Sequence, residues 1–174
     1  MNDTFFFSAP QLKRIPLGSF STILDTAALS PIATALLAEL RRWASTLLPS
    51  SVIIREHLHA GYGGLLFEVR PSLPNTMGVS IGLGSSSDID VYWGDGYRLE
   101  DWKPQEGEVL RLCEAIRAGE VVEETWKLAG LVLEKRCYIG RDRQFGSGSG
   151  LLPAWLKRLA RRSERTFRPW GEAA

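Results

Sequence analysis

The chain has 174 residues, of which 44% are apolar, 24% charged and 10% aromatic, and its formal net charge is +1. This composition is typical of one globular domain and excludes a disordered or collagen-like chain, and no apolar run approaches the roughly 20 residues of a membrane span. Two cysteines are too few for a disulfide scaffold, and Asp3 stands where a signal peptide carries Lys or Arg. We therefore expect a single cytoplasmic domain over residues 1–174.

The first 28 residues mix Phe, Pro and Gly without a period, and we expect them to form an extended arm. A helix is predicted to begin at Ser30-Pro31, because Ser suits the N-cap and Pro the first helical position. Pro49 is expected to end it. Apolar residues at spacings of three and four predict one buried face, made of Ile32, Leu36, Leu40, Trp43 and Leu47.

Four short strands are predicted next, at 52–58, 65–70, 77–83 and 88–93, because turn-forming residues separate these apolar runs. The last two alternate cleanly, with Val79, Ile81 and Leu83 on one face, followed by Ile89, Val91 and Trp93. The connections are short, which favours an antiparallel meander with one packed face and one face toward water.

The second half of the chain predicts a helix over 104–118, with Val109, Leu112, Cys113 and Ile116 as its apolar stripe. A hairpin of strands 121–128 and 131–138 follows, and the Gly-Ser run 145–150 is typical of a flexible loop. A basic C-terminal helix is expected within 151–170, opened by Pro153. The fold class is thus α+β, with a largely antiparallel sheet of about six strands and three helices packed on one side.

Charge is distributed unevenly along the chain. Residues 86–134 hold twelve acids and five bases, a balance of −7, whereas residues 135–170 hold ten bases and two acids, a balance of +8. Such asymmetry favours a basic partner for the acidic segment and a phosphate or acidic partner for the basic one. The alternative is that the two segments face each other or solvent.

Two histidines, His57 and His59, lie on one face of the first predicted strand with Arg55. Glu68, Asp88 and Asp90 could join them from neighbouring strands, and imidazoles with a carboxylate are ligands for zinc or iron. Arg55 would oppose a cation, so we expect no metal and no other cofactor.

Nucleophilic catalysis has no clear motif. Cys113 lies on the buried stripe of a predicted helix, where Cys is an inert hydrophobe. Lys135 and Arg136 flank Cys137 and would lower its thiol pKa if they converged on it. We expect no catalytic residues, with a small enzyme on the His57/His59 face as an alternative.

The segment 92–102 packs four aromatics and three acids into eleven residues. Trp and Tyr anchor protein interfaces, and acids around them complement a basic partner. Together with two preceding acids, they predict a partner-binding surface of Asp88, Asp90, Tyr92, Trp93, Asp95, Tyr97, Glu100, Asp101 and Trp102. The alternative is that Trp93 and Trp102 seal the core beneath the second helix.

Residues 107–124, with the sequence GEVLRLCEAIRAG followed by EVVEE, resemble the short-helix, Ala-Gly, strand-hairpin ending of bacterial immunity proteins, which are encoded beside polymorphic toxins. The likeness extends over about 40 residues. It implies a cytoplasmic α+β domain without catalysis that occludes a toxin's active site or an adjacent surface, often through acidic residues. The basic C-terminal segment has no counterpart in that pattern.

The leading hypothesis is therefore an inhibitor that binds a cognate toxin or effector with a basic surface. We expect neither a membrane nor a nucleic acid as its partner, and a homo-oligomer stays open. The first alternative is a nucleic-acid-associated or structural accessory protein that uses the basic C-terminal helix, and the second is the small enzyme on the His57/His59 face.

Overall fold

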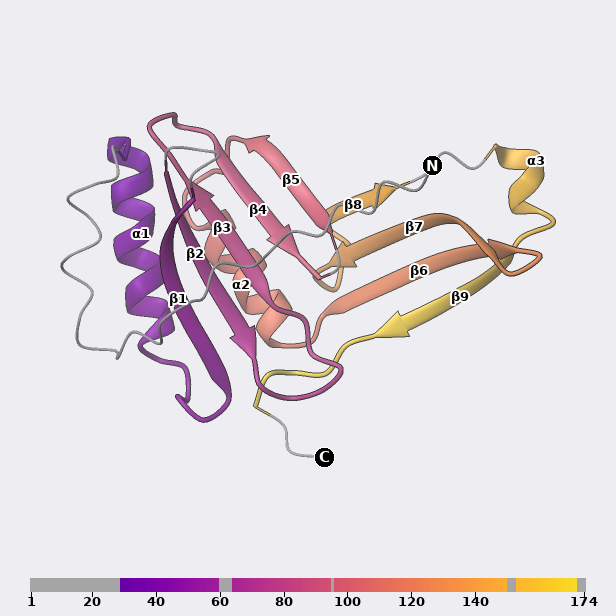
Figure 1. The fold of residues 1–174 in the computed structure, drawn as a ribbon, viewed down its shortest axis with the longest axis horizontal. Helices are drawn as coiled ribbons and strands as arrows, with labels where there is room; N and C mark the ends of the chain where they lie inside the picture. Colours follow the sequence, from indigo (N-terminus) through magenta and orange to yellow (C-terminus); the bar gives the residue numbers. More distant parts are fainter. Residues whose placement is uncertain (1–28, 60–63, 95, 150–152, 172–174) are drawn as a thin grey trace, which may run out of the picture.

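The computed structural model describes residues 29–59, 64–94, 96–149 and 153–171, which form three helices and nine strands (Figure 1). The strands make two antiparallel sheets rather than the expected single sheet of about six. The α+β class is confirmed. The arm expected over 1–28 lies outside the described residues.

The first helix, α1, spans Pro31–Ala44 and begins as predicted, because the Ser30 side chain accepts a hydrogen bond from the Ala33 backbone N–H at 3.1 Å. It ends five residues before Pro49, where hydroxyl groups of the next two residues bond to its last carbonyls. Ile32 is 54% exposed and lies outside the buried face. That face consists of Ala33, Leu37, Leu40, Trp43 and Ala44.

The larger sheet contains β1 (Val52–His59), β2 (Gly64–Pro71), β3 (Val79–Leu83), β4 (Ile89–Trp93) and β5 (Tyr97–Trp102), in that order. The four predicted strands and their meander are confirmed. The fifth strand was not predicted, because the successive acids Glu100 and Asp101 break its apolar alternation. They lie at a β-bulge that shifts the pairing with β4 between Ile89 and Val91.

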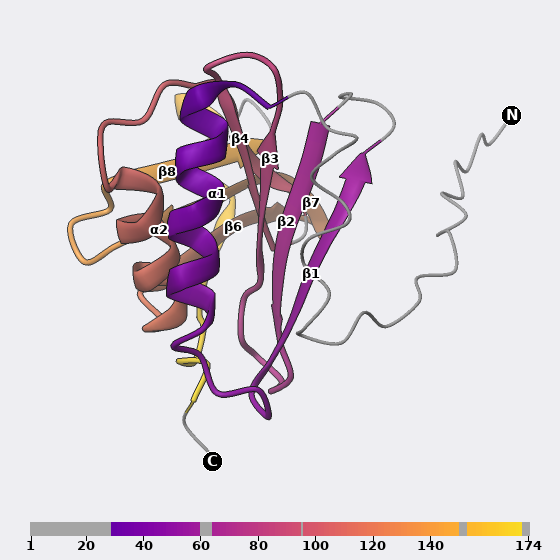
Figure 2. The same ribbon diagram turned by 90° about the vertical axis from the view of Figure 1, so that its left-hand side faces the viewer.

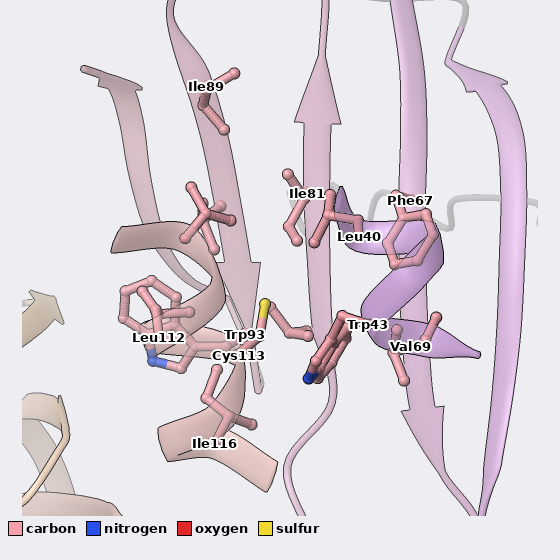
Figure 3. Close-up of a cluster of buried hydrophobic side chains, with 14 of the residues drawn as sticks. Leu40, Trp43, Phe67, Val69, Ile81, Ile89, Trp93, Leu112, Cys113 and Ile116 are labelled. Carbon is pink, nitrogen blue, oxygen red and sulfur yellow. The ribbon is translucent and has the colours of Figure 1, made fainter. Parts of the chain in front are cut away.

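The second helix, α2, spans Glu108–Arg117 and is shorter than the predicted 104–118, because Gly107 at φ +74° precedes it. Its predicted apolar stripe is buried as expected. Helices α1 and α2 cover one face of the larger sheet (Figure 2). Side chains from both helices and from β2, β3 and β4 form the core between them (Figure 3).

The smaller sheet contains β6 (Val121–Leu128), β7 (Leu131–Ile139), β8 (Phe145–Ser149) and β9 (Arg161–Thr166), in the order β8-β7-β6-β9. The hairpin of β6 and β7 is confirmed. The flexible loop over 145–150 is a wrong prediction, since β8 pairs with β7. Its glycines allow close approach: a Cβ on Gly148 would lie 3.1 Å from the Lys135 carbonyl oxygen.

The basic C-terminal helix over 151–170 is also a wrong prediction. In the described part of this span, residues 153–170, only Ala154–Lys157 is helical, as α3, and the chain then forms β9 along the edge of β6. Pairing with β6 outweighs the local helical pattern, because it brings Arg162 to the buried Glu124. Helix α3 lies at the far end of the smaller sheet, so the three helices do not pack on one side (Figure 1). Among the described residues, no helix has the length and apolar character to cross a bilayer.

Candidate functional site

One face of the larger sheet is covered by no helix of the described residues and is lined by polar side chains; we call it the outer face. Residues paired across antiparallel strands point to the same side, so one row of side chains can be followed across all five strands. This row consists of Arg55, Glu68, Ser80, Tyr92 and Arg98. The predicted placement of Arg55 and Glu68 on one face is confirmed.

The next row of the outer face holds His57 and Asp90, which the sequence also placed on this side. They lie on β1 and β4, three strand spacings or about 14 Å apart. His57 and Asp90 therefore do not converge on one ion. Within the described part of the chain, His, Cys, Asp and Glu form no group of three or more that could hold a metal. The His59 side chain lies outside the described residues.

A groove of about 450 Å³ opens where the outer face meets the smaller sheet. Its charged lining residues have close partners: Arg70 contacts the buried Glu68 at 2.7 Å, and Glu123 accepts a hydrogen bond from the hydroxyl of Tyr97, outside the groove, at 2.8 Å. Arg165 also lines the groove, beside Glu123 in the register of β6 and β9. Glu123 and Arg165 could not be placed here from the sequence, because the division into two sheets brings in Glu123 and the pairing of β9 with β6 brings in Arg165.

Four of the predicted partner-binding acids gather around the bulge between β4 and β5; we call Asp88, Asp90, Glu100 and Asp101 the acidic cluster. The Asp101 backbone N–H donates to an Asp90 carboxylate oxygen at 3.0 Å, which fixes the bulge. Glu100 contacts Arg98 at 3.2 Å and Asp88 contacts Lys103 at 3.7 Å, whereas Asp90 and Asp101 form no ion pair within the described residues. The cluster thus keeps net negative charge.

Of the four aromatic residues predicted to bind a partner, two are buried and two are partly exposed. Trp93 is 2% exposed and Tyr97 5% exposed, and their stacked rings have centroids 6.4 Å apart. Both residues therefore belong to the core, and neither is part of the predicted partner-binding surface. The alternative prediction that Trp93 seals the core is confirmed. Trp102 is half-buried, and its ring centroid lies 5.7 Å from that of Phe145. Tyr92 lies on the outer face, where it lines the groove. Asp95 lies outside the described residues.

The acidic and basic segments meet across the smaller sheet. The buried Glu124 contacts Arg143 at 3.0 Å and Arg162 at 2.5 Å, and the buried Glu134 contacts Arg136 and Lys157. The prediction that the two segments face each other is confirmed for these residues. Much of the charge asymmetry therefore stabilises the fold and is not available to a partner.

Both thiols are buried. Burial raises the pKa of the Cys137 thiol to about 11 and also raises the pKa of Cys113. The condition under which the flanking bases would lower the pKa of Cys137 is not met, because Arg136 lies on the other side of β7 and contacts Glu134. Near neutral pH both groups stay protonated, so neither serves as a thiolate nucleophile.

The arrangement therefore offers a preformed polar face, a groove with charges of both signs and an acidic cluster beside them. Such a surface is suited to recognising a polar or basic partner. No protein-family model, curated protein or solved structure matches the chain.

Proposed function

We propose that the chain is a cytoplasmic inhibitor that neutralises a bacterial toxin or effector by direct protein–protein contact through the acidic cluster. The observation that carries this proposal is the gathering of four carboxylates at one bulge, two of them without an ion pair in the described part of the chain. Such a cluster accelerates the encounter with a basic surface and disfavours acidic partners.

Rigid support beneath the cluster favours tight binding. Ile89 and Val91, which flank Asp90 on β4, are fully buried in the core, and the Asp101 backbone N–H is bonded to the Asp90 carboxylate. A surface held in its binding geometry loses little conformational entropy when a partner docks, so more of the contact energy is available as affinity. Tyr92 on the neighbouring outer face adds an aromatic contact of the kind enriched at interfaces.

Two further features support the same proposal. The segment that resembles immunity proteins forms α2 and the start of β6, directly after the strand that carries Glu100 and Asp101. Cys113 and Cys137 are free thiols, as expected in a reducing compartment. The nucleic-acid alternative relied on a basic helix, and β9 stands in its place, so it is not proposed. The enzyme alternative is not proposed either, since the side chain of His59, on which it relied, lies outside the described residues.

The test compares two single charge reversals. The partner is isolated from extracts of the source organism by affinity capture, and its binding and its own activity are measured with Glu100→Lys and with the control Glu106→Lys. Glu106 is an exposed acid outside the cluster. Inhibition of the captured protein by the unmodified chain is expected, with slower association and a weaker Kd for Glu100→Lys, most clearly at low salt.

A second variant, Glu100→Lys with Asp101→Asn, is expected to weaken binding further, at least about tenfold in total. Asn tolerates the positive φ of +51° at position 101, so this change preserves the bulge. Equal affinities for Glu100→Lys and Glu106→Lys, or a captured protein whose activity is unaffected, would contradict the proposal.

A further inference from the structure

Four large apolar side chains are exposed at the far end of the smaller sheet; we call them the apolar tip. Leu131 and Val132 follow the turn between β6 and β7 and are 69% and 49% exposed, while Trp155 of α3 and Leu159 just after it are each 65% exposed. Figure 1 shows that this end projects away from the larger sheet and from α1 and α2. The two pairs are separated in sequence, and the fold brings α3 and the turn between β6 and β7 to the same end of the smaller sheet (Figure 1).

Contacts between α3 and the hairpin hold the two halves of the apolar tip together. The Lys157 ammonium lies 3.3 Å from a Glu134 carboxylate oxygen and 5.1 Å from the centre of the Trp126 ring. Glu134 and Trp126 are paired across β7 and β6, close to the turn. Arg162 of β9 lies over the same indole at 5.8 Å, so the segment after α3 is anchored as well.

Exposed cations lie beside the apolar tip: Lys127 is paired with Val132 across β6 and β7, and Arg158 adjoins Leu159 in the sequence. Lys127, Arg158 and Arg161 are exposed, and none of them forms an ion pair with another described residue. Lys127 and Arg161 are direct neighbours in the register of β6 and β9. Like charges in that position repel each other, and an anion bound between them relieves the repulsion. The tip thus combines apolar side chains at its end with unneutralised positive charge just behind them.

A lipid surface fits these features better than a protein. A stable protein interface takes about 20–30 residues from each partner, several times more than the apolar tip and its cations supply. A bilayer accepts a projecting apolar point without a matching cavity, and Trp and Leu side chains bury well at the boundary between headgroups and acyl chains. Cations just behind such a point contact anionic headgroups.

We propose that the apolar tip inserts into the surface of a bilayer that contains anionic lipid, with Lys127, Arg158 and Arg161 bound to the headgroups. This replaces the expectation from the sequence that no membrane is involved. The contact is peripheral, and it uses the end of the molecule that projects away from the sheet carrying the acidic cluster (Figure 1). It therefore leaves the surface assigned to the protein partner free.

Vesicle binding of the full chain tests the proposal directly. Sedimentation with vesicles of phosphatidylcholine and phosphatidylserine is expected to bring down the chain, while phosphatidylcholine vesicles do not, and added salt is expected to release it. Of the six tryptophans, all of which lie in the described part of the chain, Trp155 alone is exposed. Acrylamide quenching of tryptophan fluorescence is therefore expected to fall on binding.

Matched variants locate the contact. Leu131→Ser with Val132→Ser is expected to abolish sedimentation, whereas Ile32→Ser with Leu48→Ser, at 54% and 65% exposed positions elsewhere, leaves it unchanged. Lys127→Glu with Arg161→Glu is expected to weaken partitioning at least about 25-fold, since one cation near an anionic surface contributes about fivefold. The charge control is Arg42→Glu with Arg168→Glu, both at exposed positions.

Three outcomes would overturn the proposal. They are equal binding to vesicles without phosphatidylserine, tip variants that bind like the unmodified chain, and vesicle-free self-association that the tip variants abolish. The last outcome would assign the apolar tip to a contact between copies of this chain.

Discussion

The indole rings of Trp43, at the end of α1, and Trp170, near the C-terminus, lie 6.0 Å apart with their planes inclined at 56°. The Trp43 indole N–H donates to a Glu114 carboxylate oxygen of α2 at 2.6 Å, and that of Trp170 donates to the Met77 carbonyl oxygen before β3 at 2.7 Å. This pair of tryptophans therefore connects α1, α2, the larger sheet and the chain segment that follows β9.

Removal of Trp43 is expected to be strongly destabilising. Trp43→Ala leaves a cavity in the core beside Trp170 and is expected to lower the free energy of unfolding by about 3–5 kcal/mol. Trp155→Ala is the control, because Trp155 is 65% exposed, and it is expected to change stability little. Urea denaturation measures both variants. An unchanged midpoint for Trp43→Ala would show that α1 does not pack through this residue.

A second prediction concerns the ion pair between α1 and β1. The Arg41 guanidinium holds Glu56 through two hydrogen bonds of 2.8 and 2.6 Å, and the Glu56 side chain is only 3% exposed. Arg41→Ala leaves this carboxylate buried without its partner and is expected to cost about 3–5 kcal/mol.

Two variants control for position and charge at this pair. Arg41→Lys is expected to restore only part of the loss, because an ammonium cannot reproduce the two-pronged contact. Arg42→Ala, at the exposed neighbouring position, is expected to be nearly neutral. If Arg41→Ala and Arg42→Ala had equal midpoints in urea, the ion pair would contribute nothing to the fold.

Gly119 is expected to tolerate no side chain. It has φ +72°, and an added Cβ would lie 2.7 Å from the Pro169 backbone nitrogen and 2.8 Å from the Phe167 carbonyl oxygen. Gly130→Ala isolates the conformational part of the cost, because Gly130 has a similar φ of +83° with nothing within 4 Å of an added Cβ. Gly130→Ala is expected to cost about 1 kcal/mol and Gly119→Ala clearly more. Equal losses of stability would mean that residues 167–169 do not pack on this glycine.

The thiols provide a pH-dependent prediction. Burial raises the pKa of Cys137 from 9.0 to about 11. Between these pH values the unfolded chain releases the thiol proton while the folded chain retains it. The stabilising contribution of this group is therefore complete below pH 9 and is lost as the pH rises to 11. Cys137→Ala is expected to show a smaller fall in the free energy of unfolding over this range.

Thiol labelling checks the same burial independently. At pH 8 the folded chain is expected to react with no thiol reagent, because Cys113 and Cys137 are both fully buried, and the denatured chain is expected to react at two sites. Rapid modification of either thiol in the folded chain would contradict the burial of Cys113 in α2 or of Cys137 in β7.

Elements specified by neighbouring residues could be predicted from the sequence. The N-cap of α1 depends on Ser30 and Pro31, and the meander from β1 to β4 depends on alternating apolar side chains between turn residues. The hairpin of β6 and β7 depends on Ala129 and Gly130, which have φ values of +50° and +83°. The shared outer face of Arg55 and Glu68 was predictable for the same reason, since the period of two along a strand sets its faces.

The remaining features were decided by contacts between distant segments. Gly146 and Gly148 have no side chains to indicate a strand, and β8 forms because β7 supplies its hydrogen-bond partners. The basic residues of β9 carry a helical spacing, yet pairing with β6 brings Arg162 to the buried Glu124. Tertiary partners outweigh local preference here, because a short segment gains more from a complete set of hydrogen bonds and a neutralised buried charge than from its own helical propensity.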